Sequence, residues 1–214
     1  MNRRAIVAAA IGSVLVPAGG ADAARRFVRL SGRRDLRGWH VENGKPEAWK
    51  ADGELISCIA PGGGYLTSDG QYDDFVLRLE YRIGPAGNSG IGLRYPPGGH
   101  PSTMGMELQI LDDDAPQYRD LKPAQYNGSL YRLSPPLARA ASPPGQWNRL
   151  QIRCQGPRII VHLNGVEIQN VNADEHATAE EGLTPMARRP RRGCIGLQSH
   201  GDPVDFRRIA IGVL

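Results

Sequence analysis

A run of nine residues, 75–83, has an apolar side chain at every odd position and a charged one at three of its four even positions. The odd positions hold Phe, Leu, Leu, Tyr and Ile, whereas Arg78, Glu80 and Arg82 point the other way. Successive side chains alternate between the two faces of a β-strand, while a helix repeats every 3.6 residues. The run therefore predicts a strand with one buried face and excludes a helix at this position.

Shorter apolar runs with turn residues between them recur along the rest of the chain. The strongest local signal is the segment 159–168, where Asn164 and Gly165 separate two apolar runs. Asn-Gly is typical of the two-residue type I′ turn of a β-hairpin. Many short strands at roughly even spacing predict an all-β protein, built as a two-sheet sandwich or jelly roll.

The chain has 214 residues, 40% of them hydrophobic, which is enough for one sizeable domain. Its start is typical of a signal peptide, with Arg3 and Arg4 before the apolar run 5–16 and a small-residue cleavage site. We therefore expect a signal peptide over 1–23 and a single domain over 24–214. No other segment is a candidate membrane span. The mature protein is expected to be exported, periplasmic or secreted, by the general or the twin-arginine route.

Cysteine and charge patterns argue against two classes of function. The three cysteines, Cys58, Cys154 and Cys194, cannot all be paired, and none lies in a nucleophile motif. The net charge is +4, and much of the excess lies in the run 188–192, Arg-Arg-Pro-Arg-Arg. A nucleic-acid-binding protein would interleave aromatic residues or carry a known module. We expect no nucleic-acid partner and a solvated arginine loop, with binding of an anionic ligand as the alternative.

Polar residues recur on three further apolar strands, over 88–94, 107–112 and 193–200. If apolar residues such as Ile91 face the core, their neighbours in the strand face the other way. The candidate site residues on these strands are Asn88, Arg94, Glu107, Gln109, Asp112, Gln198 and His200. If the strands share one sheet, these groups form a surface suited to binding or cleaving a carbohydrate. Tyr131 is a candidate for stacking on a sugar ring; for Trp147, core packing is the stronger expectation.

The order of several short motifs resembles that of one known family. Asp-Leu-Arg-Gly-Trp at 35–39 is followed by Asn-Ser-Gly-Ile at 88–91 and Glu-Leu-Gln-Ile-Leu-Asp at 107–112, and Gly-Leu-Gln-Ser-His comes later, at 196–200. Over residues 27–214 the chain resembles the 3-keto-disaccharide hydrolase family, formerly a domain of unknown function. The resemblance implies a concanavalin-like jelly roll. It also implies action on glycosides in which the sugar C3 is already a ketone.

A 3-keto sugar permits chemistry that ordinary glycosidases do not use. The ketone acidifies the C2 hydrogen, so a base can remove it, and the enolate can then expel the C1 substituent before water adds back. Glu107 or His200 is the expected base. Arg94 is expected to stabilise the enolate oxygen or to hold Glu107. The residues expected to bind the substrate are Asn88, Gln109, Asp112, Tyr131 and Gln198.

Several alternatives stay open on the sequence alone. Glu107 and Arg94 would also form a purely structural ion pair, and His200 would also suit a loop without chemistry. The same fold and face would serve a non-catalytic, lectin-like carbohydrate-binding module. An ordinary glycosidase needs a second nearby acid, which Glu80 would supply from a neighbouring strand. No cofactor is assigned with certainty, and a divalent metal, at the acidic residues 112–114 or assisting the chemistry, is a further alternative.

Overall fold

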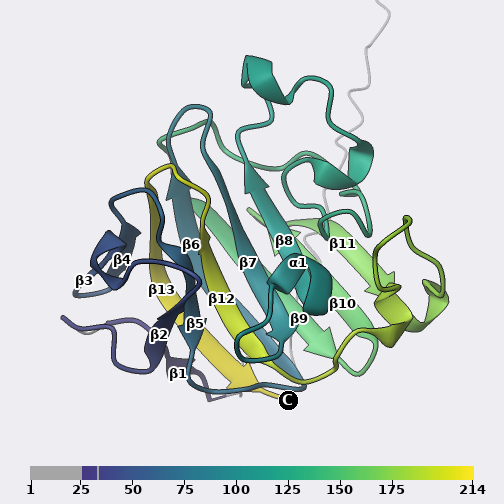
Figure 1. Cartoon of the computed structure of the whole chain (residues 1–214), viewed down its shortest axis with the longest axis horizontal. Coiled ribbons are helices and arrows are strands. Elements are labelled where there is room, and N and C mark those ends of the chain that lie inside the picture. The colour runs from purple at the N-terminus through teal and green to yellow at the C-terminus, as the bar shows by residue number, and fades with distance from the viewer. Residues whose placement is uncertain (1–25, 33) are drawn as a thin grey trace, which may run out of the picture.

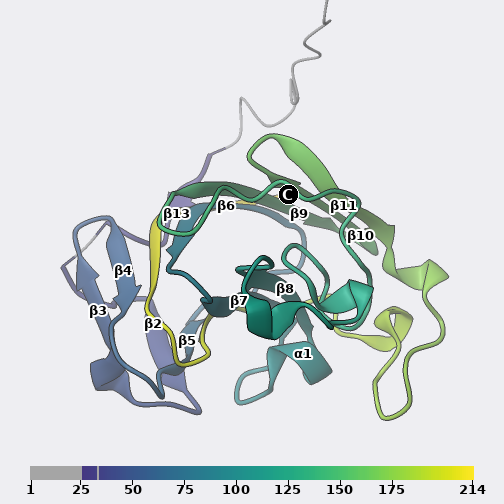
Figure 2. The same cartoon turned by 90° about the horizontal axis from the view of Figure 1, so that it is seen from above.

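The computed structural model describes residues 26–32 and 34–214, in which two antiparallel sheets pack face to face (Figure 1 and Figure 2). The larger sheet consists, in spatial order, of β11 (Val166–Asn172), β10 (Arg158–Leu163), β9 (Asn148–Gln155), β6 (Phe75–Ile83), β13 (Val204–Val213), β4 (Leu55–Cys58) and β3 (Trp49–Asp52), with β1 (Val28–Arg29) paired to β13. The smaller sheet consists of β2 (Trp39–Glu42), β5 (Gly64–Ser68), β12 (Cys194–Ser199), β7 (Asn88–Tyr95) and β8 (Met106–Leu111). The predicted all-β, two-sheet sandwich is confirmed. The expected signal peptide, 1–23, lies outside the described residues.

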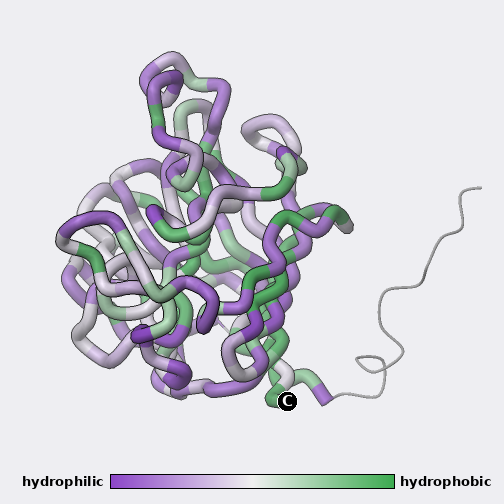
Figure 3. The backbone as a smooth tube through the Cα atoms, turned by 90° about the vertical axis from the view of Figure 1, so that its right-hand side faces the viewer, coloured by the Kyte–Doolittle hydropathy of each residue, from purple (hydrophilic) through white to green (hydrophobic). Residues whose placement is uncertain are grey.

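The central strand of the larger sheet is β6, and its side chains alternate as the sequence predicts. Leu77, Leu79 and Tyr81 point into the space between the sheets and are at most 2% exposed, whereas Arg78 and Arg82 are half-buried on the outer face. Figure 3 shows hydrophobic and hydrophilic residues alternating along the strand segments. Burying one such apolar side chain contributes about 2 kcal/mol, so the alternation determines which face of the sheet is inside.

Strands β10 and β11 form the predicted hairpin around Asn164 and Gly165. The two turn residues have φ angles of 52° and 87°, and a type I′ turn requires positive φ at both positions. The Asn164 side chain also accepts a hydrogen bond from the Arg149 backbone N–H and donates one to the Ala140 carbonyl, each at 2.8 Å. These contacts tie the turn to a neighbouring strand and loop.

Helical structure in the described residues is confined to single turns. These are η1 (Pro46–Ala48), α1 (Pro101–Met104), η2 (Pro116–Tyr118), η3 (Pro123–Gln125), η4 (Ala173–Glu175) and η5 (Met186–Arg188). The long polar stretch before β12 contains η4 and η5. Figure 2 shows α1 on the side of the smaller sheet that faces away from the larger sheet. This position matters, because α1 covers the polar face described below.

All three cysteines of the chain are buried, and none forms a disulfide. Burial raises the pKa of the Cys154 thiol in β9 to about 12. Cys154 therefore acts as a small apolar side chain. No helix in the described part of the chain is long and apolar enough to cross a membrane.

Candidate functional site

The floor of the candidate site is the outer face of the smaller sheet, where β12, β7 and β8 lie side by side. Apolar residues such as Ile91 fill the core, so the residues between them face outward. In the register of β7 and β8, Gly90 lies opposite Gln109 and Gly92 lies opposite Glu107. The three polar strands that the sequence identifies are therefore neighbours in one sheet.

Gly90 and Gly92 of β7 have no side chains, which leaves space on the floor for the Glu107 carboxyl and for Pro101. A Cβ on Gly90 would meet the Glu107 Oε1 atom at 2.6 Å, so the carboxyl lies directly across this glycine. A Cβ on Gly92 would meet the Pro101 Cγ atom at 2.8 Å, so the start of α1 rests on it. The glycines thus let both the carboxyl group and the helical turn lie against the sheet.

A hollow of about 220 Å³ opens over this floor. It is lined by Asn88, His100, Ser102, Glu107, Gln109, Tyr131, Gln198 and His200. All but two of these residues are ones that the sequence predicts for the site, and the two additions are His100 and Ser102. Glu107 is the only carboxylic acid among these lining residues.

Glu107 is 3% exposed within this hollow. Its Oε2 atom accepts a hydrogen bond from the Tyr65 hydroxyl at 3.3 Å. Burial raises the pKa of the carboxyl to about 7, and hydrogen bonds from Tyr65 and Gln198 oppose that rise. A carboxyl with this pKa is about half ionised near neutral pH, so it can both accept and return a proton.

Tyr65 of β5 and His100, just before α1, extend the network around Glu107. The Tyr65 hydroxyl accepts a hydrogen bond from the Gln198 Nε2 at 2.8 Å and lies 3.4 Å from the His100 Nε2. The two rings meet edge to face, with centroids 5.3 Å apart. Burial and the Glu107 charge raise the Tyr65 pKa, so its hydroxyl stays protonated and can donate a hydrogen bond.

Amide groups supply most of the remaining polar atoms around the hollow. The Gln109 Nε2 donates to the Asn88 Oδ1 at 3.0 Å, which joins the side chains of β8 and β7. The Gln198 Oε1 is buried and has no hydrogen-bond partner among the described residues. Because buried acceptors are normally paired, this oxygen is free for a ligand hydroxyl or a water molecule. Tyr131 is half-buried and His200 is exposed at the end of β12.

The structure contradicts the expected role of Arg94. Arg94 is fully buried away from the hollow, where its guanidinium donates to the Asp73 carbonyl at 2.6 Å and the Gly156 carbonyl at 2.8 Å. It also pairs with the Asp74 carboxylate at 3.0 Å. The cause is a β-bulge, since the register with β12 shifts here and Arg94 has a φ of 51°. The prediction that Arg94 holds Glu107 is therefore wrong.

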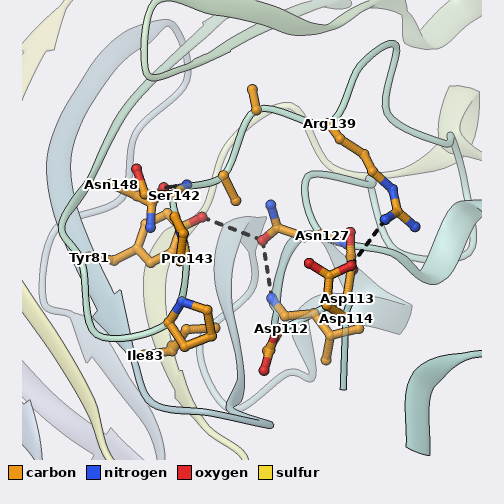
Figure 4. A pocket seen from close by; sticks show the side chains of 14 residues that line it. Tyr81, Ile83, Asp112, Asp113, Asp114, Asn127, Arg139, Ser142, Pro143 and Asn148 are labelled. Carbon is orange, nitrogen blue, oxygen red and sulfur yellow. Dashed lines mark hydrogen bonds and ion pairs between the residues drawn. The ribbon is translucent and has the colours of Figure 1, made fainter. Parts of the chain in front are cut away.

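Asp112 also does not line the hollow, contrary to expectation. It borders a second cavity, of about 160 Å³, beyond the ends of β6 and β8 (Figure 4). Its carboxylate accepts a hydrogen bond from the Ala86 N–H at 2.7 Å, and Asp113 accepts one from the Asn127 N–H at 2.7 Å. Burial raises the pKa of Asp113. Within residues 26–32 and 34–214, no three His, Cys, Asp or Glu side chains are grouped as a metal site.

Glu80 and Trp147 belong to the outer face of the larger sheet, not to the hollow. Glu80 pairs with Arg207 at 2.7 Å and Arg208 at 3.1 Å, so it does not serve as a second acid beside Glu107. The Trp147 ring contacts Arg207 and Arg82, whose guanidinium carbons are 3.9 and 4.8 Å from its centroid. Core packing of Trp147 is therefore a wrong prediction.

The arginine run before β12 is only partly the solvated loop that the sequence predicts. Arg188 and Arg192 are exposed, and Arg192 pairs with Asp73 at 2.8 Å. Arg191 forms an ion pair with Asp174. Arg189 departs from the expectation, because it is only 3% exposed.

Comparison with known proteins identifies relatives of this chain. Residues 27–212 match the family model described as the 3-keto-alpha-glucoside-1,2-lyase-like domain. The 3-keto-disaccharide hydrolase of Bacteroides thetaiotaomicron is 24% identical over 229 residues, which cover 88% of this chain and 78% of that protein. A Parabacteroides distasonis structure, provisionally described as a glycosyl hydrolase, has a TM-score of 0.79 and 25% identity, covering 88% of this chain and 100% of that one.

The jelly-roll character of the sandwich is confirmed in the same way. The structure of a Bacillus subtilis protein with a galectin-like fold superposes on this chain, and the match covers 87% of this chain and 94% of that protein. The two share the fold alone, with a TM-score of 0.53 at 13% identity. The family match spans nearly all of the described residues and agrees with the order of motifs in the sequence. This chain therefore belongs to the family of 3-keto-alpha-glucoside-1,2-lyase-like domains.

Proposed function

We propose that this protein is an exported enzyme that cleaves the glycosidic bond of 3-keto-glycosides, including 3-keto-disaccharides. The family description and the name of the Bacteroides relative support this substrate class. The observation that carries the proposal is Glu107, a single buried carboxyl with a pKa of about 7 in a polar hollow. An ordinary glycosidase needs a pair of carboxylates at the scissile bond, and the hollow is lined by one.

The reaction begins with removal of the C2 proton. The C–H electron pair forms the C2–C3 double bond of an enolate, and the ketone oxygen takes the negative charge. The enolate then collapses to the ketone, forms a C1–C2 double bond and breaks the bond from C1 to the leaving oxygen. The proton goes to that oxygen, which departs as an alcohol. Water adding at C1, with return of a proton to C2, gives net hydrolysis.

Glu107 suits the role of the base better than His200 does. Its carboxyl is buried at the sheet, whereas His200 is exposed at the rim, where a leaving group would depart. Because the Tyr65 hydroxyl stays protonated, it can donate to the enolate oxygen as charge develops there. The groups assigned to sugar hydroxyls are Asn88, Gln109 and Gln198, with Tyr131 against the ring.

The test is release of the alcohol from 3-keto-glucosides and from the matching unoxidised glucosides by the purified mature protein, with and without a chelator of divalent metals. We expect cleavage of the keto forms only, and its loss in Glu107→Gln. Glu47→Gln, at an exposed position, is the matched control and should stay active. Cleavage of unoxidised glucosides would indicate an ordinary glycosidase. Sugar binding without any cleavage, with or without added metal, would indicate a carbohydrate-binding module.

A further inference from the structure

Arg189 is a buried cation that binds only backbone carbonyls. Its Nε donates to the Thr184 carbonyl at 2.9 Å, and its Nη1 donates to the carbonyls of Ser102 at 2.8 Å and Gly105 at 2.5 Å. Among the described residues it has no carboxylate partner, and burial lowers its pKa. Burying an unpaired charge is unfavourable. The hydrogen bonds to the three carbonyls therefore have to offset this cost.

Two of the three carbonyls that Arg189 binds, those of Ser102 and Gly105, belong to α1 and to the residue that ends it. α1 is a single turn, held by hydrogen bonds from the Met104 N–H to the His100 carbonyl at 2.8 Å and from the Gly105 N–H to the Pro101 carbonyl at 3.0 Å. The last carbonyls of a helix have no partner within it, and so short a turn has little stability alone. The guanidinium satisfies these carbonyls and ties α1 to the loop before β12.

The turn held in this way forms one wall of the hollow over Glu107. Pro101 rests on Gly92, the residue directly opposite Glu107 in the sheet. His100 and Ser102 line the hollow, and their side chains meet at 3.0 Å. The position of α1 therefore determines how much water reaches the carboxyl.

We propose that Arg189 is a positioning residue that clamps α1 over the hollow and so keeps the Glu107 carboxyl out of water. The importance of this clamp for catalysis rests on the proposed function. The hydrogen bonds by which Arg189 holds α1 do not depend on that function. The titratable groups around Glu107 are Tyr65 from β5, His100 ahead of α1, Tyr131 at the edge of β8 and His200 after β12. β7 presents Gly90 to the carboxyl and adds no charge there.

The test measures the ionisation of Glu107 in the absence of any substrate. The carboxyl carbons of ¹³C-labelled glutamate are titrated by NMR, and the Glu107 signal is assigned by its disappearance in Glu107→Gln. In the wild type we expect a midpoint of about 7. Arg189→Met keeps a long aliphatic stem but loses the hydrogen-bond donors. Because water then reaches the Glu107 carboxyl, its midpoint should fall towards the ordinary 4.5. Arg188→Met, at an exposed neighbour, should leave it unchanged.

A folded Arg189→Met protein in which Glu107 still titrates at the wild-type midpoint would overturn the proposal. If that variant does not fold, Arg189→Lys decides, because lysine reaches the same region with fewer and differently placed donors. Hydrogen exchange at the Met104 and Gly105 amides should then be about tenfold faster than in the wild type, as one lost hydrogen bond predicts. Unchanged exchange would refute the clamp. Neither measurement uses turnover, so each stays informative if the proposed substrate is wrong.

Discussion

Replacing Glu107 by glutamine is expected to stabilise the protein above neutral pH relative to the wild type. Below about pH 4.5 the carboxyl is protonated in both the folded and the unfolded chain, so its ionisation does not affect stability. Between about 4.5 and about 7 the unfolded chain ionises while the buried carboxyl keeps its proton. The wild type therefore loses stability as the pH rises through this window, whereas glutamine does not titrate.

The size of the effect follows from the burial of Glu107. Its pKa rises from an ordinary 4.5 to about 7, and each pKa unit is worth about 1.4 kcal/mol. The free energy of unfolding of the wild type should therefore fall by about 3 kcal/mol relative to the variant across this window. The assay is urea unfolding of both proteins at intervals between about pH 4 and about pH 8.

The quantity that matters is the change with pH in the difference between the two proteins. A constant cost of placing an amide beside Tyr65 does not vary with pH and cancels from that change. The contributions of the other titrating groups are the same in both proteins and cancel as well. Glu47→Gln removes one negative charge from an exposed turn by the same chemical change, and it controls for the general effect of net charge. A difference that stays flat for Glu107→Gln would refute the argument that burial at the sheet raises the pKa of this carboxyl.

Three further outcomes are expected. Tyr65→Phe removes a hydrogen bond that favours the ionised Glu107, so the low-pH limb of the activity profile should move to higher pH; a limb that moves down would contradict the network. Gly90→Ala places a methyl group 2.6 Å from the Glu107 Oε1, and kcat/KM should drop by about tenfold to a hundredfold while urea unfolding changes little. Arg94→Met removes the donors to two carbonyls and the ion pair with Asp74, and it should lower the free energy of unfolding by about 3 kcal/mol, with kcat/KM of the folded fraction unchanged, because Arg94 lies outside the hollow.

Local periodicity is enough to predict the strands and most of the floor. The alternation over 75–83 and the Asn-Gly turn are properties of neighbouring residues, and the structure reproduces both. Glu107, Gln109 and Gln198 were found because each alternates with buried apolar residues in a regular strand. The sequence alone could not show that the three strands pair in one sheet, because pairing joins residues that are far apart in the chain.

The errors arise where regular alternation ends or where distant segments meet. Arg94 sits in a bulge, and one extra residue sends its side chain to the opposite face. His100 reaches the hollow from a proline-rich loop in which alternation gives no direction. Tyr65 was detectable, since it alternates with the buried Leu66 in β5, but sequence does not show that β5 pairs with β12 and so brings Tyr65 beside Glu107. Arg189 looks like its exposed neighbours in sequence, and only the contact with α1 distinguishes it.

The division of the site between sheet and loops has a consequence for how this protein can diversify. The residues assigned to proton transfer stand on paired strands, where insertions would break the register of the whole sheet. The part of the rim outside α1 comes from the loops that carry Tyr131 and His200, where changes in length are tolerated. Mutation can therefore alter which leaving group fits the entrance without disturbing the chemistry beneath it. Loop grafting between relatives is accordingly the natural route to new substrate preferences on this scaffold.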